Sequence, residues 1–207
     1  MEKFAFVFTV CFVLLGPIKL IVPFAHLTGG KPPAFRRSAA AWATLFACAV
    51  CLFVALVGGT LVEKYQLSLP ALQLTAGLVL LLSALRTIFP SGDAPHSTRG
   101  DASPLQLAVS PLATPTIVPA AGIGAILILV MGAPRFPGAY QALAISLGVI
   151  MALDFLVMYF NDRIMRAPGL LPVMQLLGGV LIVIQVALAI DTMLDAFRTL
   201  GVVAPSG

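Results

Sequence analysis

Two charged residues in apolar surroundings are the side chains of this chain best suited to do chemistry. Lys19 lies within the first long apolar run, directly after Gly16-Pro17-Ile18, and Asp154 is the one acid deep within a later run. A lysine at the centre of a membrane helix costs about 2.5–3.5 kcal/mol on insertion scales, so a retained one is a candidate functional group. It could be a counter-ion for an anionic substrate or a titrating ammonium, whereas snorkelling would give it a structural role alone. Asp154 is the natural ion-pair partner of Lys19, unless it lies near the membrane surface.

Prolines interrupt two of the apolar segments at corresponding places, and these breaks are the second candidate feature. Each interior proline removes a backbone donor and clashes with the preceding turn. The freed backbone groups are costly in hydrocarbon unless they face protein or a wet cavity. Paired breaks therefore predict a transport site near the midplane, where helix N-termini hold anions and freed carbonyls hold cations; simple structural kinks are the alternative. The candidate substrate or pathway residues are Gly16, Pro17, Lys19, Pro23, Pro111, Thr114, Pro115, Thr116, Pro119 and Asp154.

The composition indicates that membrane helices carry these residues. The chain has 207 residues, of which 60% are hydrophobic and 10% charged, with a mean hydropathy of +1.06. An average soluble domain carries about 25% charged residues, and a membrane span needs roughly 20 apolar residues. We expect an all-α polytopic membrane protein forming a single membrane domain over 1–207. Its six predicted transmembrane helices cover about 4–28, 37–61, 69–89, 104–131, 138–160 and 171–196.

A repeated segment divides the chain into two halves. Leu-Pro-Ala-Leu-Gln-Leu-Thr-Ala-Gly begins at Leu69, and Leu-Pro-Val-Met-Gln-Leu-Leu-Gly-Gly begins at Leu171. Each copy opens the third span of its half, and an odd number of spans inserts the second half upside down. The sequence predicts a 3+3 inverted repeat, with repeat 1 over about 1–89, a linker over about 90–103 and repeat 2 over about 104–200. The paired Gln73 and Gln175 are supporting candidates that bridge freed backbone or bond between helices.

The basic residues predict how the chain lies in the membrane. One predicted side holds seven Lys and Arg residues and the other holds four. Because cytoplasmic loops are enriched in Lys and Arg, we expect both termini outside the cytoplasm. The richer side carries Lys31, Arg36, Arg37, Arg86, Arg99, Arg163 and Arg166, and the other carries Lys3, Lys64, Arg135 and Arg198.

Enzyme chemistry finds little support in the sequence. We find no metal-ligand cluster, Ser/His/Asp set or P-loop, so we expect neither catalysis nor a cofactor nor a metal. The net charge of +4 is a topology signal, and no soluble domain is available to bind nucleic acid. The expected partners are membrane lipids and a small-molecule or lipid substrate, and a homo-oligomer is compatible with the sequence.

The broken segments resemble the MarC family of six-span bacterial inner-membrane proteins. The family's first-span Asn-Pro-Ile-Gly pattern corresponds to Gly16-Pro17-Ile18-Lys19, and its fourth-span Pro-Leu-Ala-x-Pro pattern corresponds to Pro111-Leu112-Ala113-Thr114-Pro115. The family's following Gly-Pro-Gly is replaced by Pro119-Ala120-Ala121. The family is named for a multiple-antibiotic-resistance locus, and a related group is described as small neutral amino acid transporters. Gly16 stands in place of the family's Asn and Lys19 in place of its Gly, which implies a different substrate.

The leading hypothesis is a secondary transporter or exporter of a small polar metabolite, such as an amino acid, working by alternating access around the two broken helices. One alternative is a flippase or binder of a phosphorylated lipid head group, which would use the same cation and helix ends. Another is a non-transporting membrane assembly protein, with Lys19 and the prolines turned toward a partner.

Overall fold

The computed structural model describes residues 2–89, 103–132, 138–166 and 169–202. Every regular element in these ranges is helical, and most of the predicted linker at 90–103 lies outside them. Five stretches are long and apolar enough to cross a membrane, and a shorter apolar helix covers Ala120–Met131. The chain is thus an all-helical polytopic membrane protein. The five long spans are Phe4–Thr28, Pro33–Lys64, Leu69–Ile88, Ala139–Tyr159 and Pro172–Thr199.

The first span is broken at its centre. It consists of α1 (Glu2–Leu15), a 3₁₀ turn η1 (Pro17–Leu20) and α2 (Ile21–Thr28). Gly16 has extended backbone angles (φ −68°, ψ 159°), because the ring of a following proline disfavours the helical region. Pro23 does not interrupt the chain in the same way. It lies in the first turn of α2, where a missing N–H is tolerated.

The fourth predicted span is broken more thoroughly than a kinked helix. It comprises α5 (Pro104–Leu107), an irregular segment η2 (Ala108–Ile117) and α6 (Ala120–Gly132). Ser110 (φ −144°, ψ 126°), Thr114 (φ −133°, ψ 128°) and Val118 (φ −112°, ψ 83°) leave the helical region. Each directly precedes a proline in the sequence, so one rule explains all three departures. The predicted proline break of this segment is therefore present, and it extends over the whole of η2.

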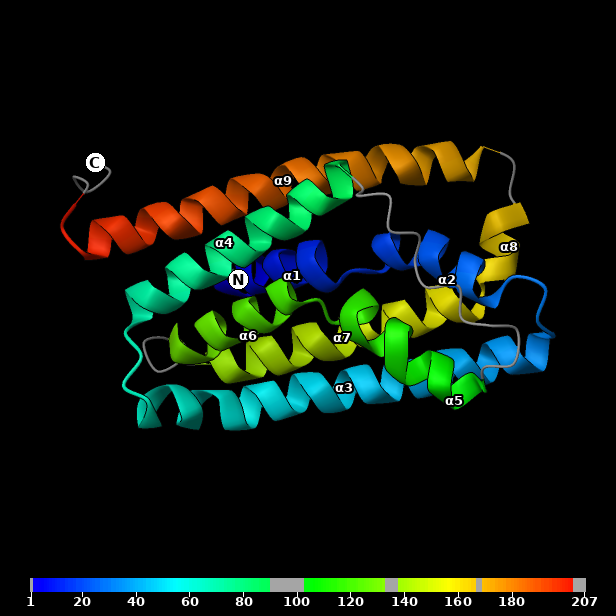
Figure 1. Ribbon diagram of the computed structural model, residues 1–207, viewed down its shortest axis with the longest axis horizontal. Coiled ribbons are helices and arrows are strands. Elements are labelled where there is room, and N and C mark those ends of the chain that lie inside the picture. The colour runs from blue at the N-terminus through cyan, green and yellow to red at the C-terminus, as the bar shows by residue number, and fades with distance from the viewer. Residues whose placement is uncertain (1, 90–102, 133–137, 167–168, 203–207) are drawn as a thin grey trace.

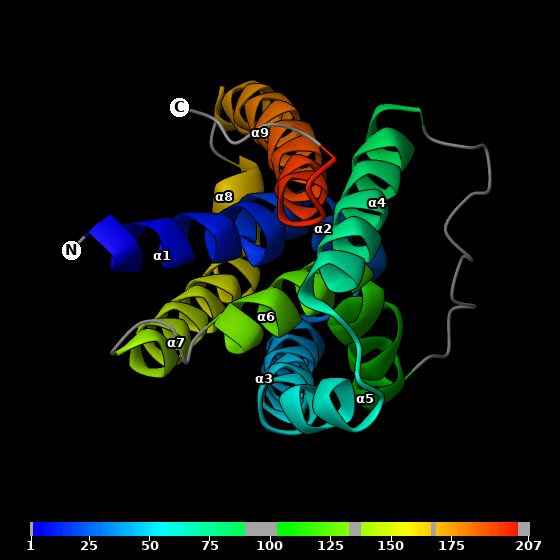
Figure 2. The same ribbon diagram turned by 90° about the vertical axis from the view of Figure 1, so that its left-hand side faces the viewer.

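The remaining helices are α3 (Pro33–Lys64), α4 (Leu69–Ile88), α7 (Ala139–Tyr159), α8 (Asn161–Arg166) and α9 (Leu170–Thr199). Helix α4 packs along α9, α1 packs on α7, and α3 packs on α6, α7 and η2; Figure 2 views this bundle from one end. In Figure 1 the chain runs left to right through α1 and α2, right to left through α3, and left to right through α4. It then runs right to left through α5 and α6, left to right through α7, and right to left through α9.

Small residues let α3 approach the irregular segment closely. Ala39, Ala43 and Ala47 recur every four residues and are fully buried, and α3 packs directly on η2. Small side chains at this spacing form one helix face that admits a neighbouring backbone. On the same helix Leu52, Phe53 and Leu56 are exposed, as expected of side chains that face lipid.

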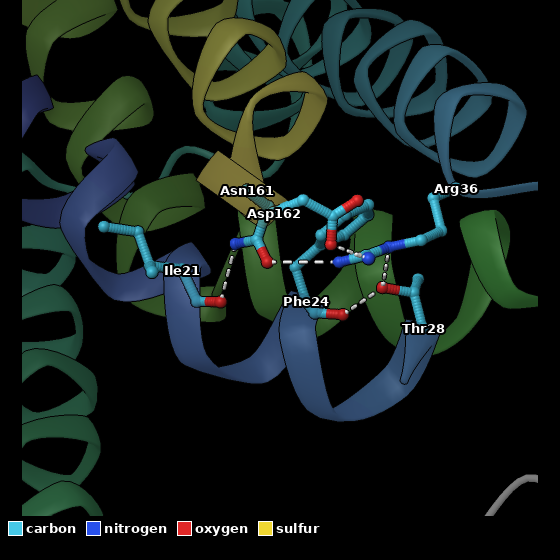
Figure 3. A network of polar contacts seen from close by, with 6 residues as sticks. All are labelled: Ile21, Phe24, Thr28, Arg36, Asn161 and Asp162. Atoms are coloured by element: carbon cyan, nitrogen blue, oxygen red, sulfur yellow. Dashed lines mark hydrogen bonds and ion pairs between the residues drawn. The ribbon is translucent and has the colours of Figure 1, made fainter. Parts of the chain in front are cut away.

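A polar network at one end of the bundle joins α2, α3 and α8 (Figure 3). Arg36 donates to Thr28 Oγ1 (3.2 Å) and Asn161 Oδ1 (3.4 Å) and pairs with Asp162. The amide of Asn161 donates to the carbonyl of Ile21 (2.9 Å). The second half of the first span is thereby fixed to the start of α3 and to α8.

The repeated segment provides a matched test of this packing. A Cβ on Gly77 would lie 2.4 Å from Met193 Cγ and 2.8 Å from the carbonyl oxygen of Ala189 on α9, whereas one on Gly179 meets nothing within 4 Å. We expect Gly77→Ala to destabilise the protein by about 1–3 kcal/mol, because the α9 backbone must shift. Gly179→Ala, at the corresponding position of the repeat, should leave stability unchanged or raise it by up to about 1 kcal/mol. Thermal unfolding in detergent measures both, and an equal loss in the two variants would contradict the close approach of α4 and α9.

Candidate functional site

The two broken segments meet at one cavity. Its volume is about 90 Å³, enough for several water molecules. Gly16 and Lys19 contribute from the first break, and Thr116, Pro119 and Ala121 contribute from the second. The break at Gly16 falls midway along the Phe4–Thr28 span. The other residues that line the cavity are Leu14, Leu15, Ser83, Thr87 and Gln185.

Lys19 is held in this cavity by a glutamine of α9. Its Nζ donates to Gln185 Oε1 at 2.6 Å, and Gln185 Nε2 donates to the carbonyl of Leu80 on α4 at 3.2 Å. Because the amide nitrogen is committed to Leu80, the amide oxygen faces the ammonium. An ammonium has three N–H donors, and Gln185 takes one of them. Within the described residues, two donors therefore remain for a bound molecule.

The ends of two half-helices add opposite partial charges to the cavity. Leu14 and Leu15 belong to the C-terminal turn of α1, where backbone carbonyls have no N–H partner within the helix. Ala121 belongs to the first turn of α6, where backbone N–H groups have no carbonyl partner within the helix. A helix C-terminus carries about half a negative elementary charge and an N-terminus about half a positive one. The site thus offers a cation, a weakly positive helix end and a weakly negative helix end within one small volume.

Asp154 does not pair with Lys19, so that expectation is wrong. It lies on α7, is fully buried, and neither carboxylate oxygen has a hydrogen-bond partner in the part of the chain that the structure describes. Its alternative placement, near the membrane surface, stays a prediction, because Asp154 lies five residues before the end of the Ala139–Tyr159 span. The pairing failed because the Lys19 side chain extends toward α9 and Gln185 instead.

The other predicted residues lie around the cavity rather than in its lining. Pro17 is buried beside Gly16, and Pro23 lies in α2. Pro111, Thr114 and Pro115 belong to η2 and shape the irregular backbone that leads to Thr116.

Gln73 and Gln175, predicted to support the site, do not line the cavity. The side-chain oxygen of Gln73 is buried and has no hydrogen-bond partner among the described residues, and Gln175 is exposed. Neither bridges the broken backbone within the described residues.

Sequence reasoning missed the residues that carry the polar contacts. Gln185 lies on α9, and the cavity also receives Ser83 of α4. Counting from Leu69 and from Leu171, Ser83 and Gln185 occupy the same place in the two repeats. Extending the repeat alignment six residues past its last matching glycines, Gly77 and Gly179, would have found both polar residues.

In the described ranges no group of three His, Cys, Asp or Glu side chains is arranged to bind a metal. Lys19, Gln185 and the hydroxyl-bearing residues around them offer hydrogen-bond donors and acceptors. The arrangement can bind and orient a small charged molecule.

Replacing Asp154 tests whether its carboxyl is really without a partner. A buried polar group left unsatisfied costs about 1–3 kcal/mol, and leucine has the same branching as aspartate. We expect Asp154→Leu to raise the thermal unfolding temperature, while Asp154→Asn, which keeps a polar amide there, should not. A Leu variant less stable than both the wild type and the Asn variant would show that a polar partner holds the carboxyl.

Comparison with known proteins agrees with this architecture. Residues 1–199 match the family described as MarC family integral membrane protein. A UPF0056 membrane protein of Methanocaldococcus jannaschii is 25% identical over 197 residues, covering 92% of this chain and 96% of that protein. The UPF0056 inner membrane protein MarC of Citrobacter koseri is 23% identical over 203 residues, covering 90% and 91%. The protein of the same description from Salmonella typhimurium is 23% identical over 202 residues, with the same coverage.

No solved structure matches the chain. The family match spans both broken segments and the repeated segment, and therefore every element that forms the cavity. The chain belongs to the MarC family of integral membrane proteins.

Proposed function

We propose that the protein is a secondary transporter or exporter of a small polar metabolite such as an amino acid. The observation that carries the proposal is the meeting of two broken membrane segments at one cavity beside a lysine. Broken helices whose ends surround a site at mid-depth are a recurrent way to bind a small ion or metabolite in a transporter. A backbone break is tolerated at that depth where it is buried in protein or lines a cavity.

The direction of the helices supports an inverted repeat as the basis of alternating access. Each of the three segments of the first half runs opposite to its counterpart in the second half: α1–α2 against α5–α6, α3 against α7, and α4 against α9 (Figure 1). Rocking of one such half against the other opens a central site to each side in turn. On this proposal six segments span the membrane, and the name of the Citrobacter koseri relative identifies its own membrane as the inner one. The Lys and Arg counts favour both termini on the periplasmic side.

The charges at the cavity suit an α-amino acid in its zwitterionic form. Its carboxylate would bind the two remaining donors of Lys19 and the N-terminus of α6. Its ammonium would bind the carbonyls at the C-terminus of α1. The cavity of about 90 Å³ admits only a small side chain without movement of the helices.

Two departures from the family pattern explain why this chain would favour a more anionic substrate. Gly16 removes the amide that the family's Asn would offer, and Lys19 adds a cation where the family has Gly. A charge-assisted contact from Lys19 to a carboxylate is about twice as strong as a neutral hydrogen bond.

Transport by the reconstituted protein tests the proposal. Proteoliposomes are loaded with a panel of small amino acids and organic anions, and exchange of the radiolabelled compounds is measured. Lys19→Met removes the positive charge but keeps a side chain of similar length. We expect exchange of the transported compound to fall at least tenfold, because one charge-assisted contact to the substrate is lost. Lys64→Met, at the end of α3, is the matched control and should exchange at the wild-type rate. Equal exchange by wild type and Lys19→Met for every compound would exclude Lys19 as the substrate contact.

A lipid-handling function is the second candidate, because the cavity reaches the molecular surface. Thr87 lines the cavity and is exposed on α4, so a phosphorylated head group could approach Lys19 from the bilayer. The same proteoliposomes, prepared with a fluorescent phospholipid, discriminate the two functions. Movement of the phospholipid between leaflets that depends on Lys19, without exchange of any soluble compound, would favour the flippase. If neither occurs, the non-transporting assembly protein becomes the leading alternative.

A further inference from the structure

A second pocket, separate from the cavity at Lys19, lies where α3 begins and α7 passes into α8. Its volume is about 320 Å³. Three arginines and one aspartate line it, so the lining carries a formal net charge of +2. Its full lining is Pro33, Arg36, Arg37, Met158, Tyr159, Phe160, Asp162 and Arg163.

The three arginines differ in what they already bind. Arg36 is committed to Asp162, Asn161 and Thr28 (Figure 3), and Asp162, the one acid of the lining, is thereby neutralised. The guanidinium of Arg37 lies 4.9 Å from the ring centre of Tyr159, and that of Arg163 lies 5.7 Å from the ring centre of Phe160. Neither has a carboxylate partner among the described residues.

Stacking on an aromatic ring holds a guanidinium by its face and leaves its in-plane N–H donors available. Two guanidinium groups held in this way at one pocket can each bind two oxygens of a phosphate group. The network of Arg36 fixes α3 to α8 and so sets the distance between the elements that carry Arg37 and Arg163. The positive charge of the pocket is thus positioned before any ligand binds.

The position of the pocket in the membrane indicates the source of the phosphate. Pro33 begins one long apolar span and Tyr159 ends another, so the pocket lies at head-group depth, where tyrosine is enriched. It lies on the side with more Lys and Arg, which is the side expected to face the cytoplasmic leaflet and its anionic lipids. Pro33 and Phe160 are exposed and give the pocket an apolar edge for the glycerol and upper acyl chain.

We propose that this pocket binds the phosphate of an anionic phospholipid head group through Arg37 and Arg163. The bound lipid would bridge the start of α3 and the α7–α8 junction on the same side as the Arg36 network. The inference does not depend on the transport proposal, because none of these residues lines the cavity at Lys19.

Binding of short-chain lipids to the full-length protein in detergent tests the proposal. Short-chain phosphatidylglycerol, short-chain phosphatidylcholine and inorganic phosphate are titrated separately, and the dissociation constant and thermal unfolding temperature are measured. We expect phosphatidylglycerol to bind at least tenfold more tightly than phosphatidylcholine and to raise the unfolding temperature. Inorganic phosphate should bind far more weakly, because it lacks the glycerol and acyl contacts. The double variant Arg37→Gln/Arg163→Gln should weaken phosphatidylglycerol binding by about tenfold or more for each arginine.

Arg86→Gln is the control for the loss of one arginine charge, since Arg86 lies on the same predicted side but outside the pocket. It should bind phosphatidylglycerol like the wild type. Arg37 and Arg163 are both exposed, so the double variant should unfold at the wild-type temperature without lipid. Equal affinity for the two lipids, or unchanged affinity in the double variant, would overturn the proposal. Phosphate binding as tight as the lipid would assign the pocket to a soluble anion instead.

Discussion

The restriction that a proline places on the residue before it is the constraint on which the rest of this structure depends. Gly16, Ser110, Thr114 and Val118 all leave the helical region directly before a proline, because steric contact with the proline ring disfavours that region. In a soluble protein such breaks would be solvated by water. In a membrane they must be buried in protein or face a cavity, so the positions of four prolines decide which two segments face each other at the centre. The small residues along α3 then let the most irregular segment pack closely.

The break at Gly16 also explains how a lysine is accommodated at mid-span. In a continuous helix, a side chain at this depth would face lipid or a tightly packed neighbour. After the break, η1 reaches both α7 and α9, and Lys19 extends to Gln185. A glutamine is a suitable partner because its amide oxygen accepts a hydrogen bond from the ammonium, while its amide nitrogen donates one to the Leu80 carbonyl. The cation is held without being neutralised, which a carboxylate partner would not have allowed.

Much of the fold could be predicted from the sequence, because apolar length and proline position act locally. The spans, the break before Pro17 and the importance of the segment around Pro111–Pro119 follow from such local rules. The hydrogen-bond and ion-pair partners of the polar residues could not be predicted in the same way. Opposite charges in apolar spans attract, and this predicts a pair between Lys19 and Asp154. The direction of a side chain, however, depends on how its helix is rotated, and hydropathy does not determine that rotation. Gln73 and Gln175 are candidates because the same residue type occurs at the same place in both copies of the repeated segment. The residues of these two helices that reach the cavity are Ser83 and Gln185, which are of different types.

That difference shows how two similar sequence segments contribute unequally to one site. The repeat places a polar residue at the same position of α4 and α9, but only the glutamine of α9 is long enough to reach Lys19 and Leu80 together. Likewise, a lysine follows the proline of the first break, whereas Ala113 occupies the corresponding place in the second. The symmetric elements therefore supply the cavity and its paired helix ends, and the asymmetric side chains supply its charge. If the protein transports as we propose, a symmetric cavity would open to either side by equivalent movements, while a single cation would give a bound molecule one preferred orientation in it. Selectivity and alternation would then be carried by different residues.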